Sequence, residues 1–429
     1  MITQLVMSHQ SNKVVAMRNV RHIQSFVPSS RLPKIRRVSC LQQRLYSHSS
    51  KSSTSYQVSD ENESISASKS YNTINKYDRF RQDIISAINL DNIISCSDNP
   101  KSYKTNLINV GKRSIEVISP NRRSFNRTWK RMEPMIDIVL TSCIESEDGD
   151  TTKQKDSARR IYSLADVGCD HGMLAISLAT ISWVTQHQHY IKLEEDKENI
   201  SHNDDRSKFG SRISFFPPTR IFGTDLSSMA LENGGLVSLK KINEAMLPLA
   251  SFNNDLPIVF HVGDGLKSLQ KGEADAIILA GMGIITMISI LEDDVDRVHA
   301  KRIFVQPTNS RPQNLMMLYE KLQQSSEWVL RDETVSYLGG RWYINAYFER
   351  CSQEVDDSFR FPGYFLVQSD VEEVRDAYDS YVKHHLRWLK EDFERPKCVL
   401  EDEDKRWLEY IQSAEENNQW KDLVSWYSQ

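Results

Sequence analysis

The sequence predicts a doubly wound α/β domain, with a mostly parallel seven-stranded sheet, helices on both faces and an antiparallel terminal strand. From residue 163 onward, short apolar runs alternate with stretches of helical periodicity, which is typical of parallel strands between covering helices. Glycines follow several of the apolar runs, where strand-to-helix turns are expected. Two β-prone runs are then joined by Gly339-Gly340, a pair that favours a tight hairpin.

The expected elements follow one another in a regular order. Residues 163–167 form a short buried strand, and an apolar helix follows over 173–185. Further strands are expected at 220–225, 257–262, 275–280, 302–306, 328–338 and 341–349. Helices are expected at 227–246, 284–298 and 312–324. In such Rossmann-like sheets, ligands bind at the carboxyl ends of the strands, near the topological switch point.

The α/β domain is expected to cover residues 125–350, with a polar surface insertion at 186–212. It begins with a helix over 127–140, whose apolar residues recur at helical spacing: Met132, Met135, Ile136 and Val139. Residues 60–124 are interpreted as a largely disordered linker that contains one short amphipathic helix over 77–95. Residues 351–429 are interpreted as a charged helical extension, which either packs on the core or a partner or shapes a substrate groove.

The first 59 residues have the composition of an organelle transit peptide. They contain no Asp or Glu but nine Lys or Arg. The segment Arg44-Leu45-Tyr46-Ser47 resembles a mitochondrial processing site, and a secretory apolar region is missing. We therefore expect a mitochondrial location, with a plastid as the alternative. A disordered basic arm that binds nucleic acid is the other interpretation of this segment.

Composition excludes several classes of protein. The net charge is -4, so any attraction for a polyanion must come from a local patch. The six cysteines are scattered without a CxxC pair, which argues against a zinc ribbon or a disulfide framework, and no metal site is predicted. No apolar run approaches the roughly 20 residues of a membrane span.

The first candidate motif lies between the first strand and its helix, at Asp166-Val167-Gly168-Cys169-Asp170-His171-Gly172. Glycines at such a turn let a ligand approach the backbone, and the helix N-terminus attracts a carboxylate or phosphate. Taken alone this turn is weak evidence, because several kinds of nucleotide use it. The dinucleotide fingerprint G-x-G-x-x-G and the phosphate-binding GK[ST] sequence are both missing.

Three further turns follow later strands. Asp225 stands where an acidic residue can accept hydrogen bonds from ribose hydroxyls, although Asp225 or Ser227 could equally cap the next helix. Gly263-Asp264-Gly265 could hold an adenine amino group, or could be a plain turn. Ala280-Gly281-Met282-Gly283 would let a flat substrate approach a cofactor, or could be a tight turn. Four such turns at one edge of a sheet are far more specific than any one of them.

The series LADVGCDHG, GTDLS, VGDGL, LAGMG and VQPTN resembles the bacterial tRNA adenine-22 N1-methyltransferase family, known as TrmK. The similarity extends upstream to Arg127-Thr-Trp-Lys-Arg-Met132 and downstream to Phe361-Pro-Gly-Tyr-Phe-Leu366, so it covers about residues 125–393. There are departures: Gly172 stands where the family usually has Ala, Ile284 replaces a Gly, and Thr308 replaces the Asn of LQPN. The 186–212 insertion and the N-terminal extension also depart from it.

The resemblance implies methyl transfer from S-adenosylmethionine to N1 of an adenine in tRNA. It implies a cofactor site formed by Asp166, Gly168, Asp170, His171, Gly172, Asp225, Leu226, Gly263, Asp264, Gly265, Ala280, Gly281, Met282 and Gly283. It implies substrate contacts from Gln306, Pro307 and Asn309, while the basic cluster Arg122, Arg123, Arg127, Lys130 and Arg131 could bind the RNA backbone or be a solvated helix face. Asp170 is the catalytic candidate, because a carboxylate can stabilise the developing cation. His171 either lines the cofactor or is a buried structural residue, and Asn309 either contacts the base or caps a helix.

Three alternatives stay open at this point. One is a methyltransferase of the same fold that acts on a protein or a small molecule. A second is a cofactor-binding or RNA-binding subunit without activity. The third is an NAD oxidoreductase, which the missing third glycine disfavours. The oligomeric state cannot be predicted from the sequence.

Overall fold

The computed structural model describes residues 76–88, 100–145, 161–199, 214–215, 218–247, 255–324, 327–351, 359–393 and 405. All of them belong to one compact unit, Glu63–Gln429. The predicted transit peptide and its processing site lie outside the described residues. No described helix has both the length and the apolar character needed to cross a bilayer.

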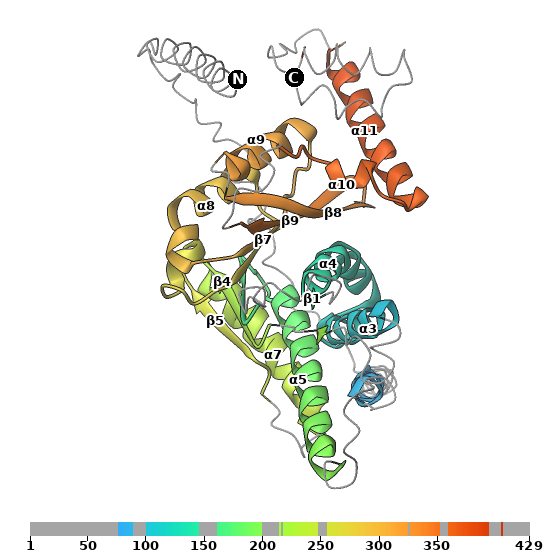
Figure 1. Ribbon diagram of the computed structural model, residues 1–429, viewed down its shortest axis with the longest axis vertical. Coiled ribbons are helices and arrows are strands. Elements are labelled where there is room, and N and C mark those ends of the chain that lie inside the picture. The colour runs from blue at the N-terminus through green and yellow to red at the C-terminus, as the bar shows by residue number, and fades with distance from the viewer. Residues whose placement is uncertain are drawn as a thin grey trace, which may run out of the picture. The chain divides into compact units, whose positions relative to one another are not determined.

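A seven-stranded sheet lies at the centre of the fold, in the order β5-β4-β2-β6-β7-β9-β8 (Figure 1). The strands are β2 (Ser163–Val167), β4 (Arg220–Asp225), β5 (Ile258–Val262), β6 (Ala276–Ala280), β7 (Arg302–Gln306), β8 (Trp328–Leu338) and β9 (Arg341–Arg350). The first five in chain order are parallel to one another, and β9 is antiparallel to both β7 and β8. The predicted fold class is confirmed. The antiparallel strand is the last in sequence, yet it lies inside the sheet between β7 and β8 rather than at its edge.

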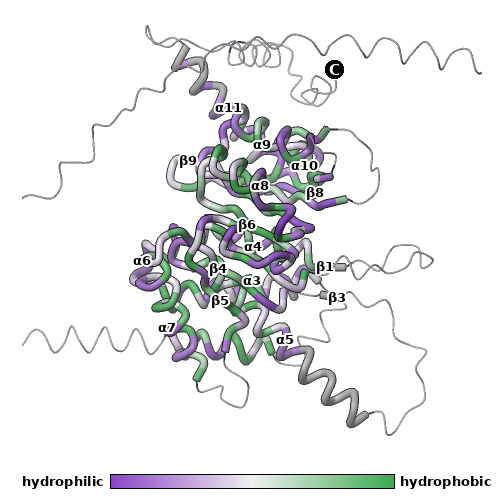
Figure 2. Tube along the Cα trace, turned by 90° about the vertical axis from the view of Figure 1, so that its left-hand side faces the viewer, coloured by the Kyte–Doolittle hydropathy of each residue, from purple (hydrophilic) through white to green (hydrophobic). Residues whose placement is uncertain are grey.

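Two hydrophobic layers cover the two faces of the sheet. One layer packs α3 (Pro100–Ile118), α4 (Arg122–Ser142), α5 (Met173–Asn199) and α7 (Val237–Met246) against residues such as Leu164. The other packs α8 (Ile284–Val298), α9 (Pro312–Gln323), α10 (Tyr364–Val367) and α11 (Glu372–Phe393) against residues such as Ala165. Adjacent residues of a strand point to opposite faces, so these continuous apolar strands serve both layers. Green, hydrophobic stretches accordingly gather around the strands in Figure 2.

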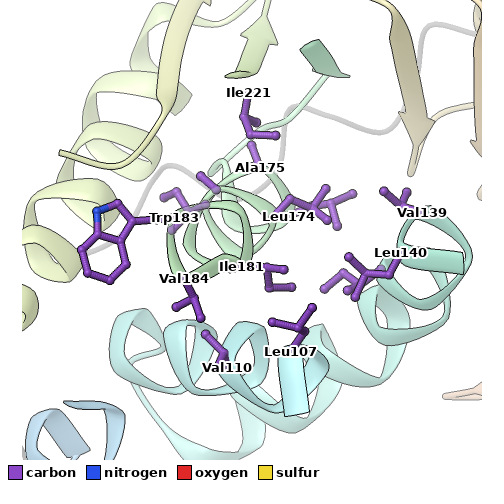
Figure 3. Packing of buried hydrophobic residues seen from close by; sticks show 14 of the residues in the cluster. Leu107, Val110, Val139, Leu140, Leu174, Ala175, Ile181, Trp183, Val184 and Ile221 are labelled. Atoms are coloured by element: carbon purple, nitrogen blue, oxygen red, sulfur yellow. The ribbon is translucent and has the colours of Figure 1, made fainter. Parts of the chain in front are cut away.

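Helix α5 is the centre of the first layer (Figure 3). Its Leu174 points toward Val139 and Leu140 of α4, and its Ile181 and Val184 point toward α3. All five side chains are at most 8% exposed. Helix α3 approaches α5 closely at Gly111, where an added Cβ would lie 2.6 Å from Ser177 Oγ.

The interpretation of residues 60–124 as a largely disordered linker is wrong for the described part of that segment. Residues 76–88 form a helix, as the expected helix over 77–95 suggested, and α3 follows at Pro100–Ile118. Phe80 and Ile84 from the first helix and Leu107 from α3 are fully buried in the core. The α/β domain therefore includes two helices upstream of its predicted start at residue 125, and α4 begins at Arg122.

The 186–212 insertion also needs correction. Helix α5 continues to Asn199, so the beginning of this segment extends the helix, while residues 200–213 lie outside the described set. Gln188 is buried within it: its Oε1 accepts a 2.5 Å hydrogen bond from Tyr103 Oη, and its Nε2 donates to the Ala87 carbonyl. A buried amide that bonds two helices explains why a polar stretch belongs to the core.

The expected helix over 227–246 is divided into three parts. A short α6 (Ser228–Ala230) leads into a π-helical turn, η3 (Leu231–Leu236), before α7 begins. The π-turn contains Gly234 and Gly235, both buried. It was not foreseen from the sequence, and its two glycines matter for the site below. A separate pair of short strands, β1 (Ile144–Glu145) and β3 (Ser214–Phe215), is antiparallel.

The C-terminal extension is joined to the core through a buried carboxylate on β8. Glu333 accepts hydrogen bonds from Tyr319 Oη at 2.7 Å, from Gly363 N at 2.8 Å and from Phe365 N at 3.1 Å. These bonds hold the start of α10, and burial raises the pKa of Glu333 to about 7 despite them. Described residues of the extension, including Tyr378 and Tyr381 of α11, are therefore part of the second hydrophobic layer.

We predict that the helix over 76–88 contributes directly to stability. Replacing Ile84, which is 0% exposed, with Ala removes buried methyl groups and should lower the free energy of unfolding by about 2–5 kcal/mol. Its neighbour Ile85 is 52% exposed, so Ile85→Ala should change it by less than about 0.5 kcal/mol. Chemical denaturation of both variants measures this difference, and equal effects would contradict the packing of this helix.

Candidate cofactor and substrate site

The four predicted turns gather at the carboxyl edge of the sheet, where backbone hydrogen bonds join the first three to one another and the fourth to the end of β7. Gly168 N and Cys169 N donate to the Thr224 carbonyl at 2.8 and 3.0 Å, which joins the turn after β2 to the end of β4. Gly263 N donates to the Asp225 carbonyl at 2.9 Å, and Gly281 N to the Gln306 carbonyl at 2.8 Å. Parallel strands in one register place all of these turns side by side.

The Asp225 side chain is the strongest link between the first motif, after β2, and the second motif, at the end of β4. Its Oδ2 accepts from the Asp170 backbone N–H at 2.8 Å, and its Oδ1 accepts from the Ser227 N–H at 2.8 Å. Ser227, not Asp225, caps α6, because its hydroxyl accepts from Ala230 N at 3.1 Å. A carboxylate offers about four acceptor sites, so Asp225 keeps capacity for hydroxyl groups of a ligand.

Left-handed backbone shapes the first motif. Gly168 and Gly172 have φ of 70° and 66°, and Asp170 has φ of 50°, which is uncommon for a residue with a side chain. An added Cβ at Gly168 would lie 2.8 Å from Met282 Cε, so the first and fourth motifs approach each other closely here. The Asp170 side chain itself remains 71% exposed at the rim of the site.

His171 packs against the unforeseen π-turn. An added Cβ at Gly234 would lie 2.2 Å from His171 Nδ1 and 2.9 Å from His171 Cα, so only glycine fits there. The His171 side chain is 54% exposed, which contradicts the interpretation of a buried structural histidine. Gly172 packs likewise on Phe260 of β5. Sequence reasoning missed Gly234 and Phe260, because nothing in a glycine pair within a helical pattern indicates which ring it accommodates.

Asp166 lies beneath these turns and is 3% exposed. It accepts a hydrogen bond from the Ala175 backbone N–H, while its Oδ2 is buried without a partner among the described residues. Burial, aided by the charge of Asp225, raises the pKa of Asp166 to about 7, although the Ala175 N–H bond and Arg131 of α4 oppose the shift. A buried carboxylate oxygen without a partner is costly, so this atom is the best-placed acceptor for a cationic or N–H group of a ligand.

Cys169 is held as a neutral thiol. Burial raises its pKa well above the ordinary value, and the neighbouring carboxylates Asp166, Asp225 and Asp170 raise it further. A thiol that stays protonated at neutral pH is a poor nucleophile. We therefore assign Cys169 a packing role.

The turns at 263–265 and 280–283, the third and fourth motifs, differ in how much open space lies in front of them. Asp264 is exposed and its carboxylate is paired with Lys267 Nζ at 2.9 Å. Gly265 has φ of 56° and its carbonyl accepts from Thr224 Oγ1 at 3.3 Å. Gly281 has φ of 77° and nothing within 4 Å of an added Cβ, so open space lies in front of it. Ala280, Met282 and Gly283 complete this turn, and Gly283 is the N-cap of α8.

Apolar side chains are exposed around this edge. Leu226, which follows Asp225, is 74% exposed, and Ile285 at the start of α8 is 69% exposed. Leu226 was expected to contact the cofactor, and its exposure leaves it available for that contact. Among the described residues, no group of three or more His, Cys, Asp or Glu is arranged to hold a metal ion.

The predicted substrate loop divides into buried and exposed residues. Gln306 is 3% exposed, and its Nε2 donates to the Arg131 carbonyl at 2.9 Å and to Asn345 Oδ1 at 2.5 Å. The expectation that Gln306 contacts a base is therefore wrong for this nitrogen, because the fold uses both of its hydrogens. Pro307 is buried, whereas Asn309 is exposed and its Oδ1 accepts from Arg311 N at 3.3 Å, ahead of α9.

The predicted basic cluster lies on the same side as the site. Arg302 Nη1 at the start of β7 donates to the Ser142 carbonyl at 2.6 Å, and Gln306 at its end donates to the Arg131 carbonyl. Helix α4 thus runs antiparallel to β7, and its N-terminal half extends about 13 Å beyond the carboxyl edge. That half carries Arg122, Arg123, Arg127, Lys130 and Arg131, all exposed.

Known proteins similar to this chain include methyltransferases. Residues 237–344 match the family model described as a methyltransferase domain. The chain is 37% identical over 82 residues, 19% of its own length, to the tRNA (adenine(22)-N(1))-methyltransferase of Bacillus subtilis (strain 168). That match spans about a third (32%) of the curated relative.

Two solved structures are also among those that match the chain. The B. subtilis M1A22 tRNA methyltransferase TrmK is 18% identical with a TM-score of 0.36, over 62% of this chain and 91% of that one. M. capricolum TrmK, solved with S-adenosyl-homocysteine, is 14% identical with a TM-score of 0.35, over 61% and 92%. The chain resembles the TrmK-like methyltransferases.

We predict that Gly234 fixes the first motif. The added Cβ of Gly234→Ala would collide with His171, displace the turn over 168–172 and destabilise the protein by about 1–3 kcal/mol. Gly283→Ala is the matched control, because its added Cβ meets only Thr286 Oγ1, at 4.0 Å. Thermal unfolding and hydrogen exchange at residues 168–172 measure both effects. Similar behaviour of the two variants would show that this contact does not hold the turn.

Proposed function

We propose that this chain transfers a methyl group from S-adenosylmethionine to N1 of an adenine in tRNA, with position 22 as the specific target. The observation that carries the proposal is the meeting of four turns at one sheet edge, above the unpartnered carboxylate oxygen of Asp166. The resemblance to TrmK and the match to a methyltransferase domain support the reaction type.

The residues at this edge fit the cofactor. Asp166 offers a buried acceptor without a partner among the described residues, and the space before Gly281 is open. Asp225 keeps acceptor capacity next to the exposed Leu226, an arrangement that suits a ribose and the apolar face of a base. When bound, S-adenosylmethionine supplies a methyl group activated by attachment to a sulfonium.

The side chains have separate tasks in this proposal. Asp166 would bind the cationic end of the cofactor, Asp225 its ribose, and Leu226 with the 263–265 turn its adenine. His171 lines the same space. The turn over 280–283 leaves open space in front of Gly281, so that base and cofactor can meet there without a side chain between them.

The chemistry of adenine N1 determines which catalytic tasks the protein has to perform. The N1 lone pair of adenine is already nucleophilic, so no general base is required before attack, and positioning carries most of the catalysis. The product adenine is positively charged. Asp170, exposed at the rim on left-handed backbone, is our catalytic candidate because its carboxylate would stabilise that charge.

The RNA must present an accessible Watson–Crick edge, since N1 is hidden in a base pair. The adenine is therefore unpaired or flipped out when it reacts. The N-terminal half of α4 offers five exposed cations beyond the carboxyl edge and would bind the phosphate backbone. Arg131 would act on both the RNA and the cofactor site, because its charge also lowers the pKa of Asp166.

The decisive experiment is to map 1-methyladenosine in mitochondrial, plastid and cytosolic tRNA after deletion of this protein. The acid-free N-terminal 59 residues support a mitochondrial location, with a plastid as the alternative. We expect loss of the mark from one organellar tRNA and its return with the purified chain and labelled cofactor. Label that appears in protein or metabolites but not in RNA would overturn the substrate, and no transfer at all would overturn the activity.

We also predict a pH dependence of cofactor binding. Asp166 titrates near pH 7 in the free protein, and a bound cation stabilises its carboxylate, so binding releases a proton. Affinity for S-adenosylmethionine should therefore fall as pH drops through about 7, by up to roughly tenfold per unit. Calorimetry from pH 8 to pH 5.5 measures this trend. Asp166→Asn should bind weakly and lack this component, and identical pH profiles for the two proteins would contradict the assignment.

A further inference from the structure

The β8–β9 hairpin projects past the site edge of the sheet. Ala346 of β9 pairs with Val305 near the end of β7, and five more residues of β9 lead to Arg341 at the hairpin turn. At about 3.3 Å per residue, the hairpin tip extends roughly 16 Å beyond that pairing. The sheet thus supplies an extension next to the proposed active site.

Three rings meet at this extension, and we name them the aromatic tip: Tyr337 of β8, Trp342 of β9 and His384 of α11. The Tyr337 and Trp342 ring centroids are 4.8 Å apart, and His384 lies 6.4 and 6.5 Å from them. Tyr337 is 56% exposed, and the turn residues Gly339, Gly340 and Arg341 that follow it are also exposed. The Trp342 indole N–H is buried without an acceptor among the described residues.

A rigid support of packed and hydrogen-bonded residues holds the aromatic tip in position. Trp342 packs edge-on against Tyr381 at 5.9 Å, and Tyr381 is 2% exposed. The Tyr381 hydroxyl donates to the Ser310 carbonyl at 2.7 Å, and Ser310 Oγ accepts from Ile344 N at 3.1 Å. Ring surfaces held in this way are ordered before any ligand arrives, which favours binding.

The same support connects the aromatic tip to the proposed active site. Thr308 N donates to the Met282 carbonyl of the fourth motif at 3.0 Å, and Ser310 follows two residues later. At most about 7 Å of backbone therefore separates the anchor of the tip from the residue bonded to the active-site turn.

Charge favours a nucleic acid as the occupant. Arg341 is exposed at the hairpin turn. Burial lowers the pKa of His385 to about 4, with smaller contributions from the charges of His384 and of nearby Arg311. The exposed cations of α4 lie beyond the same edge, on the other face of the sheet. Exposed rings flanked by cations are the arrangement on which unpaired bases stack while phosphates are bound.

We propose that the aromatic tip is a stacking site for an unpaired base of the substrate RNA, close to the adenine that is methylated. This inference rests on the proposed function and extends it. The base stacks on Tyr337 and Trp342, with His384 closing the site from α11. Because every base has an aromatic face, this site selects unpaired structure rather than sequence.

Substitutions at Tyr337 test the proposal with the full-length chain and tRNA. Tyr337→Leu removes the ring and should raise the KM for tRNA about tenfold, with the Kd for S-adenosylhomocysteine unchanged. Tyr337→Phe keeps the ring and should retain the wild-type KM. Tyr162→Leu is the matched control, because Tyr162 is 47% exposed just before β2, at the opposite edge of the sheet.

The salt dependence of the KM for tRNA distinguishes base stacking from phosphate binding. The KM ratio of Tyr337→Leu to wild type should persist as salt rises, whereas that of Lys130→Ala should shrink because phosphate contacts are screened. A Tyr337→Leu effect that disappears with salt, or one no larger than that of Tyr162→Leu, would overturn the proposal. So would a lower Tm with unchanged KM, which would assign the rings to packing against the chain itself. Failure of the wild-type chain to methylate RNA is a separate result that overturns the proposed function.

Discussion

The site depends on the hydrogen bonds that the Asp225 carboxylate accepts. The carboxylate lies at the end of β4 and accepts backbone N–H groups from Asp170 and Ser227, so one side chain positions the turn after β2 and the start of α6. The turn needs this support because Asp170 adopts left-handed backbone, which costs about 1–2 kcal/mol for a residue with a side chain. The same carboxylate that holds the turn remains available to a ligand, so structural and binding roles coincide.

The sheet was predictable because its strands are encoded locally. Four of the seven strands, β2, β4, β7 and β8, have the expected bounds, since continuous runs such as Arg302–Gln306 contain β-branched and aromatic residues between polar turns. The position of β9 inside the sheet was not predictable, because strand order depends on contacts between distant segments. The turns that form the site were found because their glycines follow those strands directly.

The features that were missed have physical reasons. Helix α3 does have helical spacing at Tyr103, Leu107 and Val110, but Gly111 and Ser114 interrupt the apolar face. Gly111 is required there by the close approach of α5, which no local pattern reveals. The π-turn at Leu231–Leu236 similarly serves His171 and Phe260, residues distant in sequence. Tertiary contacts decided both cases.

Gln306 shows how one buried amide can organise a surface it does not touch. By donating to the Arg131 carbonyl and to Asn345, it fixes α4 and β9 to the end of β7. The exposed cations of α4 and the hairpin tip therefore keep a defined position relative to Met282 and the open space before Gly281. Net charge is -4, so attraction of RNA has to be local, and a local field acts well only when its charges are fixed near the reacting atoms. A residue expected to contact the substrate directly instead determines where the substrate-binding surfaces lie.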